Sequence, residues 1–147
     1  MGHRRKAREF AMQALYMYET VGTPVDELTR LDWVDKEIPE DIMDFAINLI
    51  TGTIANIDCI DNLIKQYSRN WKFERINPVD KSILRISVYA LLYCDAIPHA
   101  VTIDEGIELG KIYGSENSGQ FINGILDNLV KEFNQEDKIK KTGRGLM

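Results

Sequence analysis

Cysteine is scarce in this chain of 147 residues, which contains only Cys59 and Cys94. The two lie far apart in the sequence, and neither belongs to a pair with the short spacing of a metal site or a redox motif. Each stands in an apolar, helix-like run, which favours a small buried side chain with a free thiol. The sequence therefore offers neither a disulfide framework nor a cysteine metal site.

Histidine and the motifs of catalysis are also scarce. The only histidines are His3 and His99, and neither has a serine or cysteine beside it in the context of a nucleophile. The sequence has no phosphate-binding glycine loop and no dinucleotide fingerprint. Acid pairs such as Asp104 and Glu105 are explained by helix starts, where carboxylates meet the positive end of the dipole. We therefore predict a protein that is not an enzyme, with no catalytic residue, no metal and no cofactor.

Long hydrophobic runs are missing as well. No segment approaches the roughly 18–20 uninterrupted apolar residues that span a bilayer, and the first residues lack the apolar stretch and cleavage site of a secretory signal. Hydrophobic residues still make up 44% of the chain, which is enough for an ordinary core. We expect a soluble, cytoplasmic protein that does not bind a membrane.

The apolar residues that are present recur every three or four positions, the spacing of amphipathic helices, and no stretch alternates with the period of two typical of strands. Asn77 and Pro78 have the composition of a helix start, and Thr102 with Glu105 fits a capping box at another start. Gly52 lies inside a long helical pattern, where it predicts either close contact with another backbone or a slight bend. The pattern predicts helices over residues 4–18, 26–37, 39–67, 78–94, 102–113 and 118–133, with a short helical link within 68–77.

These helices predict an all-α fold in which six to seven helices form one compact bundle. The helix over 78–94 is apolar almost all round, which is typical of a central helix surrounded by its neighbours. We predict a single domain over residues 1–134. The polar and basic segment 135–147 contains glycine and is predicted to be a flexible tail.

Positive charge is concentrated at the start of the chain. The net charge is −5, but residues 1–8 carry four basic residues and no acid, which leaves 14 basic and 23 acidic residues after them. Cations at the start of a helix oppose its dipole, a local cost without an evident structural return. The four basic residues are Arg4, Arg5, Lys6 and Arg8.

An aromatic residue shares one predicted helix face with two of these cations. Arg5, Arg8, Met12 and Tyr16 follow one another at steps of three, four and four residues, which places them along one side of a helix. Arginine pairs with phosphate oxygens in a planar fork, and a ring accepts an unstacked base. The charge pattern alone leaves two interpretations open, a nucleic-acid surface and a solvated charged surface.

Four sequence blocks carry a resemblance to a known family. Residues 4–16 read RRKAREFAMQALY, residues 80–86 read DKSILRI, residues 97–111 read IPHAVTIDEGIELGK and residues 120–127 read QFINGILD. Together they resemble the NusB family of bacterial transcription antitermination factors. The blocks come in the order of the family and span about residues 4–130. Three positions depart from its pattern: Gln120 stands where a lysine is usual, and Gly106 and Gly110 replace alanines.

The resemblance implies an all-helical fold of two three-helix halves. It also implies binding to the boxA RNA of nascent ribosomal RNA transcripts together with the ribosomal protein NusE, and through that complex an indirect association with RNA polymerase. The RNA-binding residues carried over by position are Arg4, Arg5, Lys6, Arg8 and Tyr16, with Phe121 beside them. The residues carried over to the surface for the protein partner are Asp80, Lys81 and Arg85.

Two alternatives belong to other functional classes. The same fold occurs as an RNA-recruiting accessory domain in the modification of ribosomal RNA, although no cofactor-binding segment follows in this sequence. The chain could also be a helical adaptor that binds only proteins. RNA affinity that falls with salt separates the first interpretation from the adaptor, and methyl transfer to RNA would favour the accessory.

Overall fold

The fold is a bundle of helices in a computed structural model that describes residues 2–143, with side chains described for residues 4–134. No strand occurs within residues 2–143, which confirms the all-α prediction. A 3₁₀ turn, η1, covers Phe73–Arg75. The α-helices are α1 (Gly2–Thr20), α2 (Val25–Arg30), α3 (Glu40–Ala55), α4 (Ile57–Tyr67), α5 (Pro78–Tyr93), α6 (His99–Tyr113) and α7 (Ser118–Gly143).

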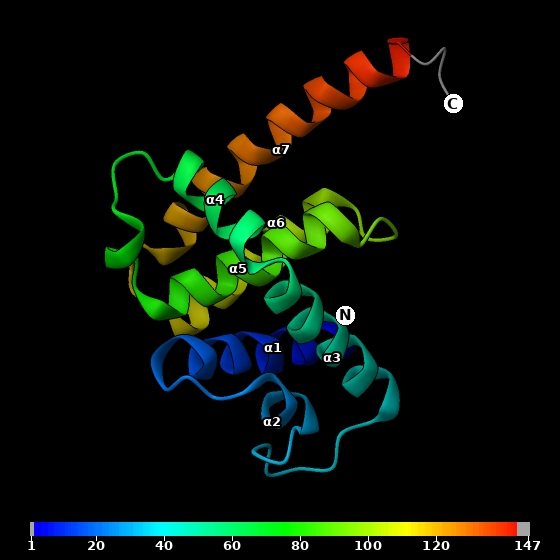
Figure 1. The fold of residues 1–147 in the computed structure, drawn as a ribbon, viewed down its shortest axis with the longest axis vertical. Coiled ribbons are helices and arrows are strands. Elements are labelled where there is room, and N and C mark those ends of the chain that lie inside the picture. The colour runs from blue at the N-terminus through cyan, green and yellow to red at the C-terminus, as the bar shows by residue number, and fades with distance from the viewer. Residues whose placement is uncertain (1, 144–147) are drawn as a thin grey trace.

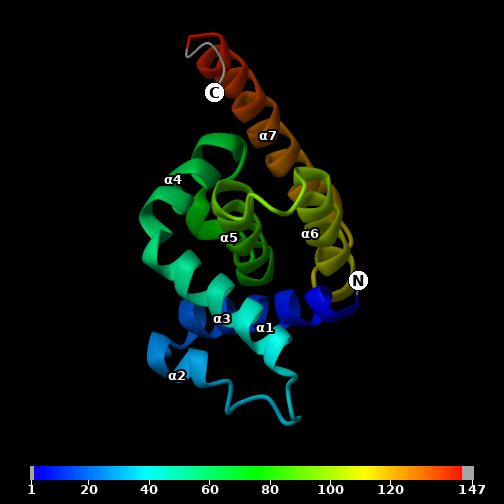
Figure 2. The ribbon, with the colours of Figure 1, turned by 90° about the vertical axis from the view of Figure 1, so that its right-hand side faces the viewer.

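The helices form two groups that meet along α1 and α5. In Figures 1 and 2, α1, α2 and α3 lie at one end of the molecule and α4 to α7 at the other, and the later part of α7 extends away from the rest. Helix α1 packs against α3 and α5, and α5 also packs against α4, α6 and α7. The first helix is therefore held by both groups.

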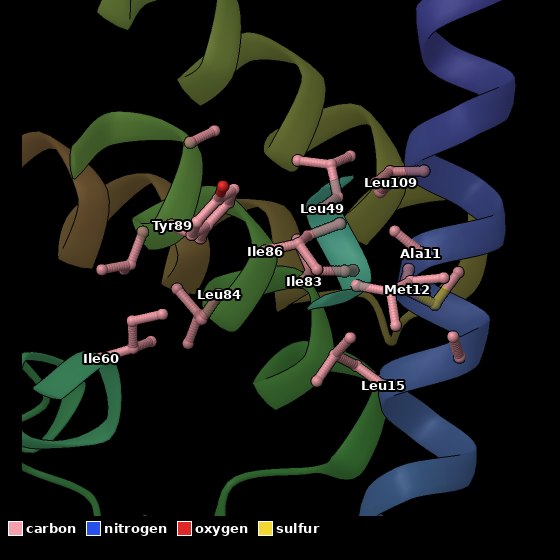
Figure 3. Packing of buried hydrophobic residues seen from close by; sticks show 14 of the residues in the cluster. Ala11, Met12, Leu15, Leu49, Ile60, Ile83, Leu84, Ile86, Tyr89 and Leu109 are labelled. Carbon is pink, nitrogen blue, oxygen red and sulfur yellow. The ribbon is translucent and has the colours of Figure 1, made fainter. Parts of the chain in front are cut away.

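Helix α5 is the centre of the fold, as its sequence predicts. Asn77 caps it, because its Oδ1 accepts hydrogen bonds from the backbone N–H of Val79 at 2.8 Å and of Asp80 at 3.4 Å. Every residue from Asp80 to Leu91 is buried. Figure 3 shows side chains of α5 meeting those of α1, α3, α4 and α6 in the core that the two groups share.

The predicted helix over 26–37 is wrong in its length. Helix α2 ends at Arg30, because Leu31 adopts a left-handed conformation with φ of 57°. The indole N–H of Trp33 then donates to the Leu28 carbonyl at 3.1 Å, and its ring packs edge-on against Phe10 with centroids 6.4 Å apart. The tertiary packing of Trp33 therefore replaces the last turns of the predicted helix.

The predicted helix over 39–67 is two helices, α3 and α4, that meet at Asn56. The side-chain amide of Asn56 donates to the Gly52 carbonyl at 2.8 Å, a local bond that competes with continued helix. Gly52 makes the predicted close contact, but with a ring: a Cβ at this position would overlap the Tyr89 side chain. The chain changes direction four residues after the glycine.

Two other helix ends differ from prediction. Helix α6 begins at His99 after Pro98, so Thr102 lies inside the helix, its buried hydroxyl has no hydrogen-bond partner, and the capping box does not form. Helix α7 continues past Phe133 to Gly143, because the intervening residues include good helix formers and no glycine or proline. Residues 144–147 of the predicted flexible tail lie outside the described residues.

Both cysteines are free thiols. Cys94 is half-buried, whereas Cys59 is exposed on α4. The prediction of burial is therefore wrong for Cys59. Burial raises the pKa of the Cys94 thiol.

Within the described residues, no group of histidine, cysteine and acidic side chains could hold a metal ion, and no helix has the length and apolar character that crossing a membrane would require.

Candidate nucleic-acid interface

The basic residues of the first turns of α1 divide into exposed and buried cations. The core-facing side of α1 is made of Ala7, Ala11 and Leu15, all fully buried. Arg4 and Lys6 are exposed, and Arg5 is half-buried. The Nζ of Lys6 lies 3.2 Å from a carboxylate oxygen of Glu9, one turn along the helix.

Arg5 and Arg8 share one acid of another helix, Glu105 of α6. The Nε and Nη2 groups of Arg5 donate to the two Glu105 oxygens at 3.0 and 2.8 Å, and Nη1 of Arg8 lies 3.7 Å from Oε1. The hydrogen bond from Arg5 is the main cause that holds the pKa of Glu105 below its ordinary value, and it raises the pKa of Arg5. The three side chains form a charged cluster between α1 and α6.

Arg8 is buried, with a relative exposure of 6%, contrary to the exposed position that the sequence pattern predicts. Its guanidinium lies 5.4 Å from the centre of the Phe45 ring of α3, and that of Arg4 lies 4.9 Å from the same ring. Burial lowers the pKa of Arg8, and its Nη2 has no hydrogen-bond partner. The predicted face is therefore interrupted, because α3 and α6 cover its middle.

Tyr16 is the exposed aromatic of this face and lines an apolar groove of about 290 Å³. Tyr16 is 40% exposed, whereas Met12 of the same predicted face is buried. Burial, followed by the nearby acid Glu9, raises the pKa of Tyr113. The groove is lined by Met12, Gln13, Tyr16, Met17, Trp33, Val79 and Tyr113.

Phe121 is half-buried in a second pocket, of about 210 Å³, beside the N-terminal end of α5. Its ring packs edge-on against that of Trp71, with centroids 6.0 Å apart, and Trp71 is 57% exposed. Asp80 lines the same pocket and has a buried Oδ1 without a partner. Burial raises the pKa of Asp80, and the nearby Ser118 side chain opposes this rise.

Lys81 and Arg85, predicted to face a protein partner, are buried in an ion cluster with Glu19 of α1 and Asp61 of α4. Lys81 Nζ and Arg85 Nη1 each lie 2.9 Å from a Glu19 oxygen. Arg85 also donates from Nε and Nη2 to the two Asp61 oxygens, both at 2.8 Å. Phe73 of η1 covers the cluster, with its ring centre 4.3 Å from Lys81 Nζ. Of the three predicted partner-binding residues, only Asp80 lines a pocket described at the surface.

The structure brings the predicted RNA-binding residues onto adjoining surfaces but not into one site. Lys6 and Tyr16 are ten residues apart on α1, about 15 Å at 1.5 Å per residue. Val79 lines the Tyr16 groove and the next residue, Asp80, lines the Phe121 pocket, so the two hollows are neighbours. Sequence reasoning missed Trp33 and Tyr113 as groove residues, and the signal available was only their aromatic character near helix ends.

These features define the class of the molecule: a small helical protein with a localised basic turn and two aromatic-lined hollows on a body that is otherwise acidic. The family model described as the NusB family matches residues 5–131. The chain belongs to the NusB family.

Individual relatives and solved structures agree with this family. The transcription antitermination protein NusB of Syntrophus aciditrophicus is 47% identical, over 93% of this chain and 85% of the relative, and that of Desulfatibacillum aliphaticivorans is 41% identical, over 96% and 99%. The crystal structure of NusB from T. maritima superposes with a TM-score of 0.80 at 38% identity, over 88% of this chain and 91% of that one. A structure of the antitermination factors NusB and NusE in complex with double-stranded RNA contains a chain with a TM-score of 0.81 and 25% identity, over 90% and 98%.

Proposed function

We propose that this chain is an RNA-binding transcription antitermination factor. It binds the boxA RNA of nascent ribosomal RNA transcripts together with the ribosomal protein NusE, and through that complex it acts indirectly on RNA polymerase. It works in the cytoplasm and performs no catalysis. Membership of the NusB family carries this proposal, and the cations and aromatic hollows supply a physical route to it.

Phosphates and bases bind to different parts of the surface in this proposal. Arg4, Arg5 and Lys6 neutralise phosphates at the start of α1, where Arg4 and Lys6 are exposed and Arg5 is half-buried. Arg8 contributes indirectly, because its buried guanidinium contacts the Glu105 carboxylate and the Phe45 ring. Tyr16 accepts an unstacked base, which stacks on aromatic rings in single-stranded RNA recognition.

Phe121 and the start of α5 belong to the surface shared with the protein partner. Phe121 contacts RNA, and Asp80 lines the same pocket beside the surface for the partner. Lys81 and Arg85 act on the partner indirectly, because their buried ion pairs fix α1, α4 and α5 around that surface.

The test is a titration of boxA RNA by fluorescence anisotropy, with and without NusE, at several salt concentrations. We expect the combined variant Arg4→Ala/Lys6→Ala to bind more weakly and to lower the salt slope by about one for each lost phosphate contact. Lys131→Ala is the matched control, because this exposed lysine pairs with Asp127 on α7. NusE binding with no RNA affinity at low salt would favour the protein-only adaptor and overturn the proposal.

A further inference from the structure

An acid stands in the middle of the proposed phosphate-binding turn. Glu105 is only 6% exposed, and both of its oxygens are directed at cations of α1. A carboxylate beside a phosphate-binding surface repels RNA by simple electrostatics, so its presence there needs another explanation. The sequence explanation, a capping box at the start of α6, does not apply, because Glu105 lies two turns inside that helix.

The geometry of Arg5 supplies that explanation. Glu105 takes the Nε and Nη2 donors on one edge of the guanidinium, at 3.0 and 2.8 Å. Nη1 and the second N–H of Nη2 stay available on the other edge, because a guanidinium has five N–H donors in a fixed plane. The Arg5 side chain is 37% exposed. A phosphate can therefore approach an arginine whose orientation is already set.

The Glu105 side chain is itself held in place by Arg8. Arg8 lies 3.7 Å from its Oε1 and is 7% exposed at the side chain, and the Phe45 ring lies against that guanidinium. The pKa of Glu105 is held down by Arg5 and, more weakly, by Arg8, so the carboxylate remains charged and keeps both hydrogen bonds. The contacts run from α3 through Arg8 and Glu105 to the exposed edge of Arg5.

We propose that Glu105 is a positioning residue for RNA binding, which orders the Arg5 guanidinium for a phosphate before RNA arrives. An arginine free in solvent must lose rotamer freedom when it binds, and a residue that orders it beforehand removes part of that cost. This inference rests on the proposed RNA-binding function. It predicts that RNA affinity falls when Glu105 is neutralised. Simple electrostatics predicts the opposite, because removal of an acid beside the basic turn should raise RNA affinity.

The experiment compares Glu105→Gln with Glu108→Gln, both measured as boxA RNA affinity in the presence of NusE. Each change removes one negative charge from α6 near Arg5, but Glu108 influences Arg5 only through space and pairs with Lys111 at 3.4 Å. We expect E108Q to bind RNA as tightly as the unaltered chain or slightly more tightly. We expect E105Q to bind at least about threefold more weakly, within the usual range of coupling between contacting residues, and to lower the salt slope by about one.

A double-mutant cycle with Arg5→Ala separates positioning from a general loss of structure. If Glu105 acts through Arg5, E105Q has no further effect on RNA affinity in the R5A background. A loss from E105Q that persists in that background, or an E105Q affinity equal to that of E108Q, overturns the inference. Circular dichroism verifies that each variant is folded at the temperature of the assay.

Arg5→Lys provides a second test that does not depend on the folding of E105Q. Lysine keeps the charge but lacks the planar fork that Glu105 orients, so we expect R5K to bind RNA nearly as weakly as R5A. An R5K variant that binds like the unaltered chain overturns the inference. If the unaltered chain ignores boxA RNA even with NusE at low salt, the proposed function itself fails, which is a different outcome.

Discussion

Replacement of Arg85 by methionine tests whether the buried ion cluster is structural. Arg85 is 4% exposed, and its guanidinium makes three hydrogen bonds, two to Asp61 at 2.8 Å and one to Glu19 at 2.9 Å. Burial alone would lower the pKa of Arg85, but the hydrogen bonds with these acids raise it, so the charged form is favoured. Methionine is of similar length and carries no charge, so the variant leaves two carboxylates without their shared partner.

The expected cost is about 3 kcal/mol, the low end of the range for breaking a buried ion pair. Two features keep it low. The side chains of Asp61 and Glu19 are 16% and 28% exposed, which allows partial hydration, and Glu19 retains Lys81 at 2.9 Å. For a chain of this size, that cost lowers the midpoint of thermal unfolding by about 6–12 °C.

Urea and thermal denaturation followed by circular dichroism measure this change. Arg75→Met, at an exposed position of η1, is the control and should change the free energy of unfolding by less than about 0.5 kcal/mol. The double variant Asp61→Asn/Arg85→Met should be more stable than Arg85→Met alone, because it removes the orphaned charge. A single variant as stable as the control, or a double variant less stable than the single, would refute the reasoning.

Further predictions concern packing, capping and pH. Gly52→Ala should lower the free energy of unfolding by about 1–3 kcal/mol through overpacking, because its Cβ would overlap the Tyr89 ring. Gly124→Ala should raise it by up to about 1 kcal/mol, because no atom lies within 4 Å of its Cβ. Equal midpoints of urea unfolding for the two variants would contradict this prediction. Asn77→Ala should cost about 1 kcal/mol in the same assay, because two backbone N–H groups lose their cap, and an unchanged midpoint would count against the cap. The pKa of Glu105 lies below its ordinary value of 4.5, so the stabilisation of the fold by the Glu105 carboxylate is present above that pH and is lost as the pH falls further. Acid unfolding of Glu105→Gln should therefore be less steep than that of the unaltered chain. Identical profiles of stability against pH would exclude the effect.

The sequence predicted the helices where the pattern was local. The apolar spacing of α1 and α5 and the cap at Asn77 follow from residues a few positions apart, because helical hydrogen bonds join residues four apart. The errors lie at helix ends, where a single side chain competes with the helical pattern. Trp33 ends α2 by bonding the Leu28 carbonyl and packing on Phe10, and Asn56 interrupts what the spacing alone describes as one helix.

The candidate site was predictable in part for the same reason. The concentration of cations in residues 1–8 and the exposure of Tyr16 can be expected from sequence, and the resemblance to the NusB family added Phe121. The burial of Arg8 could not be expected, because its spacing is as compatible with solvent as with a neighbouring helix. Lys81 and Arg85 were predicted to face a partner, and their internal acids become visible only in the fold.

The sequence by itself determined that the chain is helical, that positive charge gathers at its first turn, and to which family it belongs, since all three depend on residue type and short-range order. Only the tertiary structure decided which cations remain available to a ligand. Arg5 and Glu105 are one hundred positions apart, and Coulomb attraction and hydrogen bonding act over a few ångströms in space, without regard to distance along the chain.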